Sequence, residues 1–120
     1  MMTLPFKRVM AVAAIAVASG LFGACIPGAT PAEHIGFFFE EHTDDALKIA
    51  NCESGMDPTA VSPGGGNHGL FQINSIHRAE FERRTGASWS QIYDPWWNTM
   101  YARMLFDAQG WGPWSCKRVL

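Results

Sequence analysis

The sequence predicts a mainly α fold of the α+β kind: a small helical domain with a short β or turn element and one disulfide. Several segments repeat apolar residues at helical spacing between a capping residue and a glycine. One Pro/Gly-rich turn region precedes a short apolar run that favours a hairpin arm. Cys52 and Cys116 bracket most of the part expected to fold. At 120 residues, the chain is long enough for one small domain.

The first 25 residues have the composition of a secretory signal peptide. Lys7 and Arg8 precede a run without charge that extends from Val9 to Cys25. A basic start followed by a short run of small apolar residues is typical of exported proteins. A membrane anchor is usually nearer ~20 apolar residues and richer in leucine. We therefore expect export to an oxidising compartment, with a retained anchor as the alternative.

The odd number of cysteines is explained if Cys25 has a separate fate. The stretch LFGAC around it is similar to the lipobox of bacterial lipoproteins, although Phe22 stands where that pattern usually has leucine. Cys25 is therefore a candidate lipidation site that would attach the protein to a membrane. Ordinary cleavage nearby is the alternative. Cys52 and Cys116 would then pair, and closing this loop adds about 4 kcal/mol on a chain-entropy argument.

After removal of residues 1–25, seven basic and eleven acidic residues remain, so the formal net charge is −4. This charge argues against nucleic acid as a partner. The four histidines have no cysteine or carboxylate at metal-ligand spacing, and the glycines at 64–66 do not open a helix as a phosphate-binding loop would. We expect neither a metal nor a cofactor. Residues 26–32 are expected to form a Pro/Gly/Ala linker, and residues 33–120 the folded domain.

Two helices are expected at the start of this domain. The first is short and packs through Ile35, Phe38 and Phe39. The second has Thr43 as its N-cap and ends at Gly55, which can adopt the left-handed conformation of a helix stop.

One face of the second helix places a carboxylate on an apolar stripe. The residues at i, i+3, i+4 and i+7 of this face are Ala46, Ile49, Ala50 and Glu53. Glu53 also lies near the negative end of the helix dipole. Burial and the dipole both disfavour the ionised form, so we expect a raised pKa for Glu53. Ser54 has no histidine paired with it locally, so it is not expected to be a nucleophile.

The middle of the domain carries shorter elements. Leu70 to Ile73 is a candidate hairpin arm after the Pro/Gly turn. Residues 75–86 predict a helix capped by Asn74 or Ser75 and stopped by Gly86. The stretch SWSQIY predicts one more helical turn.

The clearest helix is expected over residues 94–110. Asp94 is its N-cap, Pro95 its first residue and Gly110 its stop. Its apolar stripe is predicted to comprise Trp97, Tyr101, Met104 and Ala108. The chain then ends in a Trp-rich loop, WGPWSC.

Four stretches together resemble the lysozyme-like superfamily, above all the bacterial soluble lytic transglycosylase (SLT) type and its small exported actinobacterial and phage relatives. They are ALKIANCESGMDPTAV, HGLFQINS, DPWWNTMYA and GWGPWSC, and the resemblance spans roughly residues 33–116. It implies a lysozyme-like fold and peptidoglycan glycan strands as the substrate. In that family the glutamate of an ES pair at a helix end is the catalytic acid and base, which maps onto Glu53. The GLFQI segment, here Gly69 to Ile73, forms part of the floor of the sugar-binding cleft.

Glycosidic cleavage suits Glu53, because the leaving oxygen is protonated by a carboxyl group that keeps its proton near neutral pH. Gln72 and Asn74 offer amides for N-acetyl and hydroxyl groups. Tyr101, Trp111 or Trp114 offer faces for sugar stacking, with packing near the disulfide as the alternative for the tryptophans. The expected substrate-binding residues are Ser54, Gly69, Leu70, Phe71, Gln72, Asn74, Asn98, Tyr101 and Trp111.

One position departs from animal c-type lysozymes, which have a second carboxylate two residues before the glycine of the matching segment. That position here is Asn67, which cannot act as a carboxylate nucleophile. The single-acid pattern favours a lytic transglycosylase that cuts the bond between N-acetylmuramic acid and N-acetylglucosamine and leaves 1,6-anhydro ends. Asp57, Asp94 and Asp107 are also present, but sequence spacing does not place them opposite Glu53.

Three other hypotheses stay open: a hydrolytic lysozyme on the same fold, a non-catalytic wall-binding lipoprotein that keeps the cleft, and a structural lipoprotein. Glu53 argues against the last two, because a pure binder gains nothing from a desolvated acid. We expect a monomer, either secreted or anchored at the extracytoplasmic side of a bacterial cell envelope.

Overall fold

The computed structural model describes residues 28–120. The predicted signal peptide and its lipobox cysteine, Cys25, lie outside this part. In chain order the elements are α2 (Pro31–Phe39), the 3-10 turn η1 (Glu40–His42), α3 (Thr43–Ser54), β1 (Asn67–His68), β2 (Ile73–Asn74), η2 (Ser75–His77), α4 (Arg78–Thr85), η3 (Trp89–Tyr93), α5 (Pro95–Gln109) and η4 (Ser115–Val119). The mainly helical fold, the two-stranded sheet and the single Cys52–Cys116 disulfide confirm the predicted fold class.

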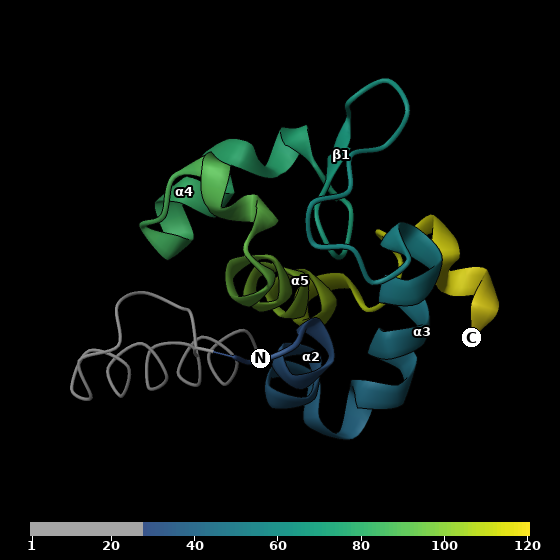
Figure 1. Ribbon diagram of the computed structural model, residues 1–120. Coiled ribbons are helices and arrows are strands. Elements are labelled where there is room, and N and C mark those ends of the chain that lie inside the picture. Colours follow the sequence, from purple (N-terminus) through teal and green to yellow (C-terminus); the bar gives the residue numbers. More distant parts are fainter. Residues whose placement is uncertain (1–27) are drawn as a thin grey trace.

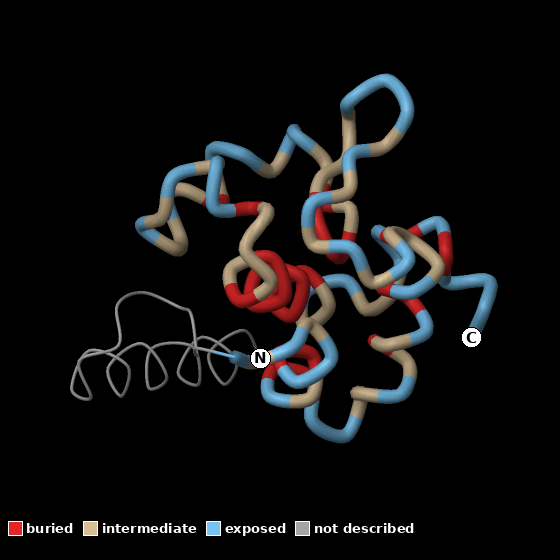
Figure 2. The backbone as a smooth tube through the Cα atoms, in the orientation of Figure 1, coloured by how far each residue is buried: buried red, intermediate tan, exposed pale blue. Residues whose placement is uncertain are grey.

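Helix α5 lies at the centre, with α2, α3, α4 and the hairpin arranged around it (Figure 1). Its start follows the sequence signal, because the Asp94 carboxylate accepts the Trp96 backbone N–H at 2.9 Å and Pro95 occupies the first turn. Trp96 and every residue from 98 to 105 are buried, which gives the red core seen in Figure 2.

The predicted apolar stripe of α5 was too narrow and partly misplaced. Ala108 is exposed and Trp97 is only half-buried, whereas polar residues such as Thr99 and Arg103 are buried. Neighbouring elements surround the middle of α5, so burial follows position along the helix more than one face. The Arg103 guanidinium is accommodated by the Phe38 and Phe39 carbonyl oxygens and the Asp107 carboxylate.

Two boundaries near the N-terminus differ from the prediction. Helix α2 begins at Pro31 behind the N-cap Thr30, so residues 31–32 of the expected linker are helical. Thr43 is not an N-cap: its hydroxyl donates to the Glu40 carbonyl oxygen, and His42 precedes the helix without a side-chain cap. The turn η1 leads directly into α3, which leaves no extended N-cap residue. Gly55 ends α3 with φ of 66°, as predicted.

The hairpin pairs β1 with β2 antiparallel, with Asn67 opposite Asn74 and His68 opposite Ile73. Only Ile73 of the predicted arm lies in a strand, because Leu70 and Phe71 form the tip and are fully buried. Gly69 is required there: its φ is 80°, and a Cβ would lie 2.6 Å from the Ile92 carbonyl oxygen.

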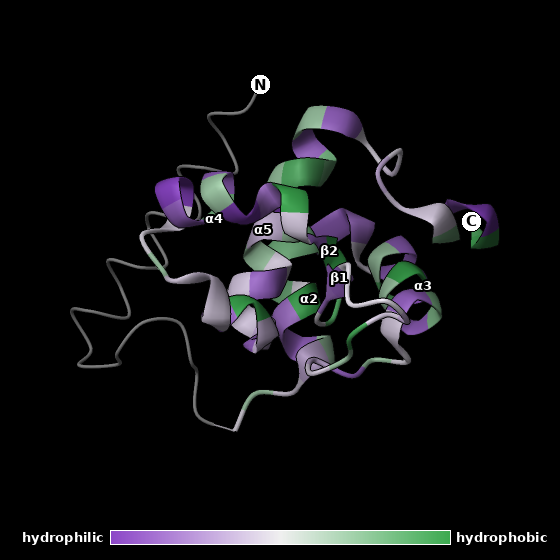
Figure 3. Cartoon of the chain, turned by 90° about the horizontal axis from the view of Figure 1, so that it is seen from above, coloured by the Kyte–Doolittle hydropathy of each residue, from purple (hydrophilic) through white to green (hydrophobic). Residues whose placement is uncertain are grey.

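The remaining elements agree with the sequence pattern. The Asn74 side chain caps η2, Gly86 ends α4 in the left-handed conformation, and the predicted turn near Trp89 is η3. Helix α4 is predominantly hydrophilic, whereas the C-terminal turn mixes hydrophilic and hydrophobic residues (Figure 3). Within residues 28–120, none of the helices combines the length and apolar character that crossing a membrane requires.

Candidate active site

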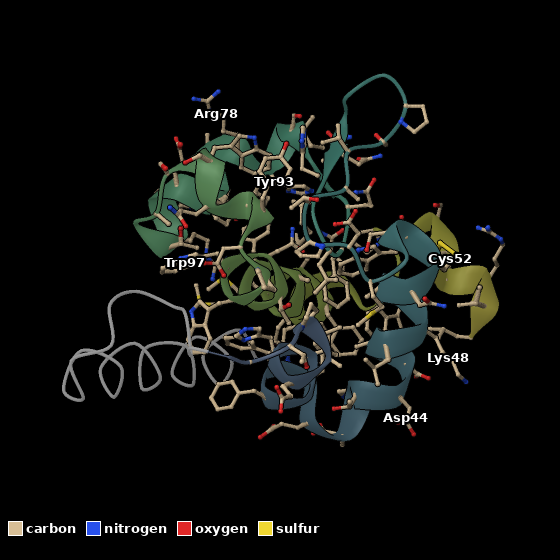
Figure 4. All side chains as sticks on the ribbon, viewed as in Figure 1. Asp44, Lys48, Cys52, Arg78, Tyr93 and Trp97 are labelled. Carbon is tan, nitrogen blue, oxygen red and sulfur yellow. A yellow bond between two sulfur atoms is a disulfide. The ribbon has the colours of Figure 1, made fainter. Side chains whose placement is uncertain are left out.

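Glu53 lies in the last turn of α3, on the face whose other members are fully buried, namely Ala46, Ile49 and Ala50. The carboxylate is half-buried, and its Oε2 accepts the backbone N–H of Cys116 at 3.2 Å. Cys116 is disulfide-bonded to Cys52, the residue before Glu53, as predicted (Figure 4). The disulfide therefore holds the C-terminal turn η4 against the acid.

Burial raises the pKa of Glu53 above the ordinary value for a glutamate. The Cys116 N–H, the positive charge of Arg118 and a hydrogen bond with Ser115 oppose the shift without cancelling it. The direction predicted from the apolar helix face is confirmed. A carboxyl group in such a place keeps its proton to higher pH, as a general acid must.

Ser54 connects the end of α3 to the hairpin. Its hydroxyl lies 2.7 Å from the Leu70 carbonyl oxygen and 3.1 Å from that of Ala50, and its oxygen accepts the Asp57 N–H at 3.2 Å. These bonds occupy the hydroxyl, so Ser54 holds the hairpin tip beside Glu53.

Asn98 anchors the same tip from the other side. Its Oδ1 accepts the Phe71 N–H at 2.8 Å, and its Nδ2 donates to the carbonyl oxygens of Ile92 at 2.9 Å and His68 at 3.1 Å. Trp114 adds a bond from Nε1 to the Phe71 carbonyl oxygen at 2.9 Å. Asn98, Leu70 and Phe71 were expected to contact substrate, but all three are fully buried. Their contacts hold the hairpin tip in place.

A pocket of about 490 Å³ opens between the hairpin, η2 and the end of α5. Its lining residues are Asn67, Gln72, Ile73, Asn74, Ile76, His77, Leu105, Gln109, Pro113 and Trp114. Glu53 is not one of them. Two hydrogen bonds connect the end of α3 with segments that contribute to the lining: Glu53 accepts from Cys116, two residues after Trp114, and Ser54 donates to Leu70, two residues before Gln72.

Three amides on the pocket wall are fixed in orientation by internal bonds. Gln72, which has a positive φ of 52°, donates from Nε2 to the carbonyl oxygens of Ala60 and Gly69 at 3.1 and 3.0 Å. Within the described residues no group bonds to its Oε1, which is available as an acceptor. Asn74 donates to Asn67 Oδ1 at 2.9 Å, and in the part of the chain that the structure describes Asn67 Nδ2 is available as a donor.

Two aromatic residues expected to meet the substrate lie elsewhere. Tyr101 is 1% exposed and donates from its hydroxyl to Glu80 Oε1 at 2.8 Å. The Trp111 ring packs against Phe106 and Phe39, with ring centroids 4.4 and 5.6 Å apart. Neither lines the pocket; Tyr101 is buried, whereas Trp111 is partly exposed and its contact with substrate stays a prediction. Conversely, His77 and Gln109 line the pocket but were not predicted, because neither carries a local signal that distinguishes it from other polar residues.

The other candidate carboxylates are engaged away from the pocket. Thr59 donates to Asp57 from its backbone and its hydroxyl, at 2.9 and 2.8 Å, and these bonds lower the pKa of Asp57. Asp94 caps α5, and Asp107 pairs with Arg103 at 3.1 Å. The pocket lining contains no carboxylate. Within the described part of the chain, no group of three or more His, Cys, Asp or Glu side chains is arranged to hold a metal ion.

Comparison with known families identifies one match. The model of the family described as "Transglycosylase SLT domain" matches residues 40–109, more than half of the chain. The matched region contains Glu53, the hairpin and all of α5. No curated protein and no solved structure matches the chain.

Proposed function

Because the chain belongs to the transglycosylase SLT domain family of the lysozyme-like superfamily, we propose that Glu53 is the catalytic acid and base with which it cleaves its substrate. The family match makes the chain an enzyme, a lytic transglycosylase or lysozyme-like glycosidase, with peptidoglycan as its substrate. The observation that carries the proposal is the half-buried Glu53 carboxylate on an apolar helix face, with its pKa raised by burial.

The proposed reaction cuts the bond between N-acetylmuramic acid and N-acetylglucosamine. Protonated Glu53 donates its proton to the glycosidic oxygen, and the bond from that oxygen to the anomeric carbon breaks. The carboxylate then accepts the proton of the muramic acid 6-hydroxyl, whose oxygen bonds to the anomeric carbon. Glu53 ends protonated, no water is consumed, and the product carries a 1,6-anhydro ring.

The amide side chain at Asn67 supports this route. A hydrolase needs a second group to activate water or to hold a covalent intermediate. Asn67 stands where c-type lysozymes have that carboxylate, and its Oδ1 is bonded to Asn74. A hydrolytic reaction on the same fold is the competing activity, and the products distinguish the two.

We further propose export, with Cys25 as the lipid attachment site. The basic start, the uncharged run and the LFGAC stretch support this proposal, as does the disulfide, which needs an oxidising compartment. Metabolic labelling with a palmitate analogue tests it. We expect label in the wild-type chain and none after Cys25→Ala, and an unlabelled wild-type chain contradicts lipidation.

Glu53→Gln tests the role of the acid. The amide keeps the shape of the side chain but has no proton to donate, so clearing of a peptidoglycan suspension should fall by about a hundredfold or more. Glu41→Gln is the matched control, because it makes the same change at an exposed position in η1. A folded Glu53→Gln variant that clears at the wild-type rate would exclude Glu53 as the acid.

A further inference from the structure

We propose that His77 is a substrate-binding residue whose Nε2 accepts a hydrogen bond from a sugar hydroxyl or an acetamido N–H. Tyr101 and Glu80 hold its ring in the tautomer that carries the proton on Nδ1 and leaves Nε2 as an acceptor. This inference rests on the proposed function, because it takes the pocket to be filled by an acetamido-sugar chain. His77 ends η2 and lines the pocket.

A chain of two hydrogen bonds defines which ring nitrogen carries the proton. The Tyr101 hydroxyl donates to Glu80 Oε1 at 2.8 Å and lies 3.3 Å from His77 Nδ1. A hydroxyl has one proton to donate, and a carboxylate only accepts. With the Tyr101 proton directed at Glu80, the bond to the ring requires that Nδ1 donates its own proton to the Tyr101 oxygen.

The Glu80 carboxylate, at the far end of this series of hydrogen bonds, is also held in place. Arg84 and Arg83 lie 3.6 and 3.8 Å from Glu80 Oε2 and form ion pairs with it. Burial, together with the bond to Glu80, raises the pKa of the Tyr101 hydroxyl, which therefore keeps its proton. The proton positions thus follow from these internal contacts and do not depend on the pocket being occupied.

A neutral imidazole with its proton on Nδ1 has a lone pair on Nε2. Within residues 28–120, no side chain or backbone group bonds to that atom of His77. His68 provides a contrast nearby, since its two ring nitrogens contact the Tyr93 hydroxyl at 2.7 Å and the Ser75 hydroxyl at 2.8 Å. Both ring nitrogens of His68 are therefore engaged within the fold, whereas Nε2 of His77 can still accept a hydrogen bond.

The other pocket groups indicate the class of ligand. Gln72 retains an acceptor and Asn67 a donor, each on a side chain that is otherwise held by internal bonds. With His77, the wall presents both kinds of group in fixed orientation, which suits a sugar with hydroxyl and acetamido groups. In Figure 1, α3 with Glu53 and α4 lie on opposite sides of the hairpin, so η2, directly before α4, meets a part of the glycan away from the cleaved bond.

The protonation form is tested without any ligand. Ring ¹⁵N chemical shifts should show His77 with its proton on Nδ1 in the Glu53→Gln variant, at a pH where the ring is neutral. Tyr101→Phe should shift His77 toward the other tautomer. A His77 ring that carries its proton on Nε2 before Tyr101 is changed would overturn the proposal.

Binding is tested by calorimetry in the Glu53→Gln background with a soluble tetrasaccharide of alternating N-acetylglucosamine and N-acetylmuramic acid. His77→Asn keeps a group near the Nδ1 position but loses the outer acceptor, so Kd should rise about three- to tenfold. His77→Gln places an amide oxygen near the Nε2 position and should stay within about twofold. His42→Asn, outside the pocket, is the matched control and should leave Kd unchanged.

The outcomes separate the two proposals. Unchanged affinity for the His77→Asn variant, with normal binding in the Glu53→Gln reference, overturns the role of His77 and leaves the proposed function intact. No binding to the Glu53→Gln reference contradicts the proposed function, and the role of His77 with it. Thermal unfolding of each variant shows whether a loss of affinity reflects loss of folding, and the ring shifts of the unmutated His77 test the proposal in that case.

Discussion

The backbone N–H of Cys116 donates a 3.2 Å hydrogen bond to the Glu53 carboxylate. Cys116 is itself bonded through sulfur to Cys52, which precedes Glu53 in the chain. The acid and its hydrogen-bond donor are thus tied together twice, once along α3 and once across the disulfide. Because the donor is a backbone group, only the position of η4 determines whether the bond is made.

The first prediction concerns this covalent link. The double variant Cys52→Ser/Cys116→Ser should unfold at lower urea concentration, with a loss of about 4 kcal/mol on the chain-entropy model for a loop of this length. Its turnover should also fall under conditions where it remains folded, because η4 is free to move from the carboxylate. Equal urea midpoints for this variant and the wild type would show that the disulfide does not stabilise the domain.

The second prediction concerns the anchor of the hairpin tip. Asn98→Ala leaves the buried Phe71 N–H and Ile92 carbonyl oxygen without their side-chain partner, so the free energy of unfolding should fall by about 3 kcal/mol. Asn51→Ala, at an exposed position on α3, is the matched control and should change it by less than about 0.5 kcal/mol. Similar losses in the two variants would contradict the anchoring role.

Glu53 with its disulfide and Asn98 with the hairpin tip show which features of the fold and site the sequence predicts. Gly55, Gly86 and Asp94 were predicted correctly, because helix caps and stops depend on a few neighbouring residues. The raised pKa of Glu53 was predictable for the same reason, since its helix face is set by local spacing. The type and order of the helices followed from such local signals, and the disulfide pair followed from the cysteine count once Cys25 was assigned a separate fate.

Contacts between distant segments were not predictable. Asn98 was expected to touch substrate, yet all its amide bonds go to backbone groups of the hairpin and η3. Trp111 was expected to stack on sugar, and its packing on Phe39 carried no local sequence signal. His77 was not predicted to bind substrate, because its proposed role depends on the contact with Tyr101, 24 residues away in the sequence. Local sequence patterns do not show which side chains face the pocket.

The third prediction follows from the raised pKa of Glu53. As pH rises above 4.5, the unfolded chain releases this proton while the folded chain keeps it, so the stability of the wild type falls until the folded pKa is passed. Glu53→Gln lacks this loss. Chemical unfolding across pH should therefore find the variant more stable than the wild type at neutral pH, with the difference vanishing below 4.5. A stability difference that does not change with pH would contradict the shift.

The fourth prediction concerns His34, which is 4% exposed and lies edge-on to Trp96. Burial lowers the pKa of His34, although the nearby charges of Asp94 and Glu33 oppose the shift. As pH falls below 6.5, His34 binds a proton in the unfolded chain but not in the folded chain. The free energy of unfolding therefore declines until the pH passes the pKa of His34 in the folded chain. His34→Leu should flatten this decline in thermal unfolding scans, and an unaltered decline would assign it to other groups.

The most direct test of the account is the mass of the muropeptides released from purified peptidoglycan. A 1,6-anhydromuramic end is one water lighter than a reducing end, so one spectrum identifies the reaction. We predict mainly anhydro ends from the wild-type protein and no released muropeptides from the Glu53→Gln variant. A wild-type digest that contains only reducing ends would contradict the transglycosylase reaction, and anhydro ends released equally by the variant would contradict Glu53 as its acid and base.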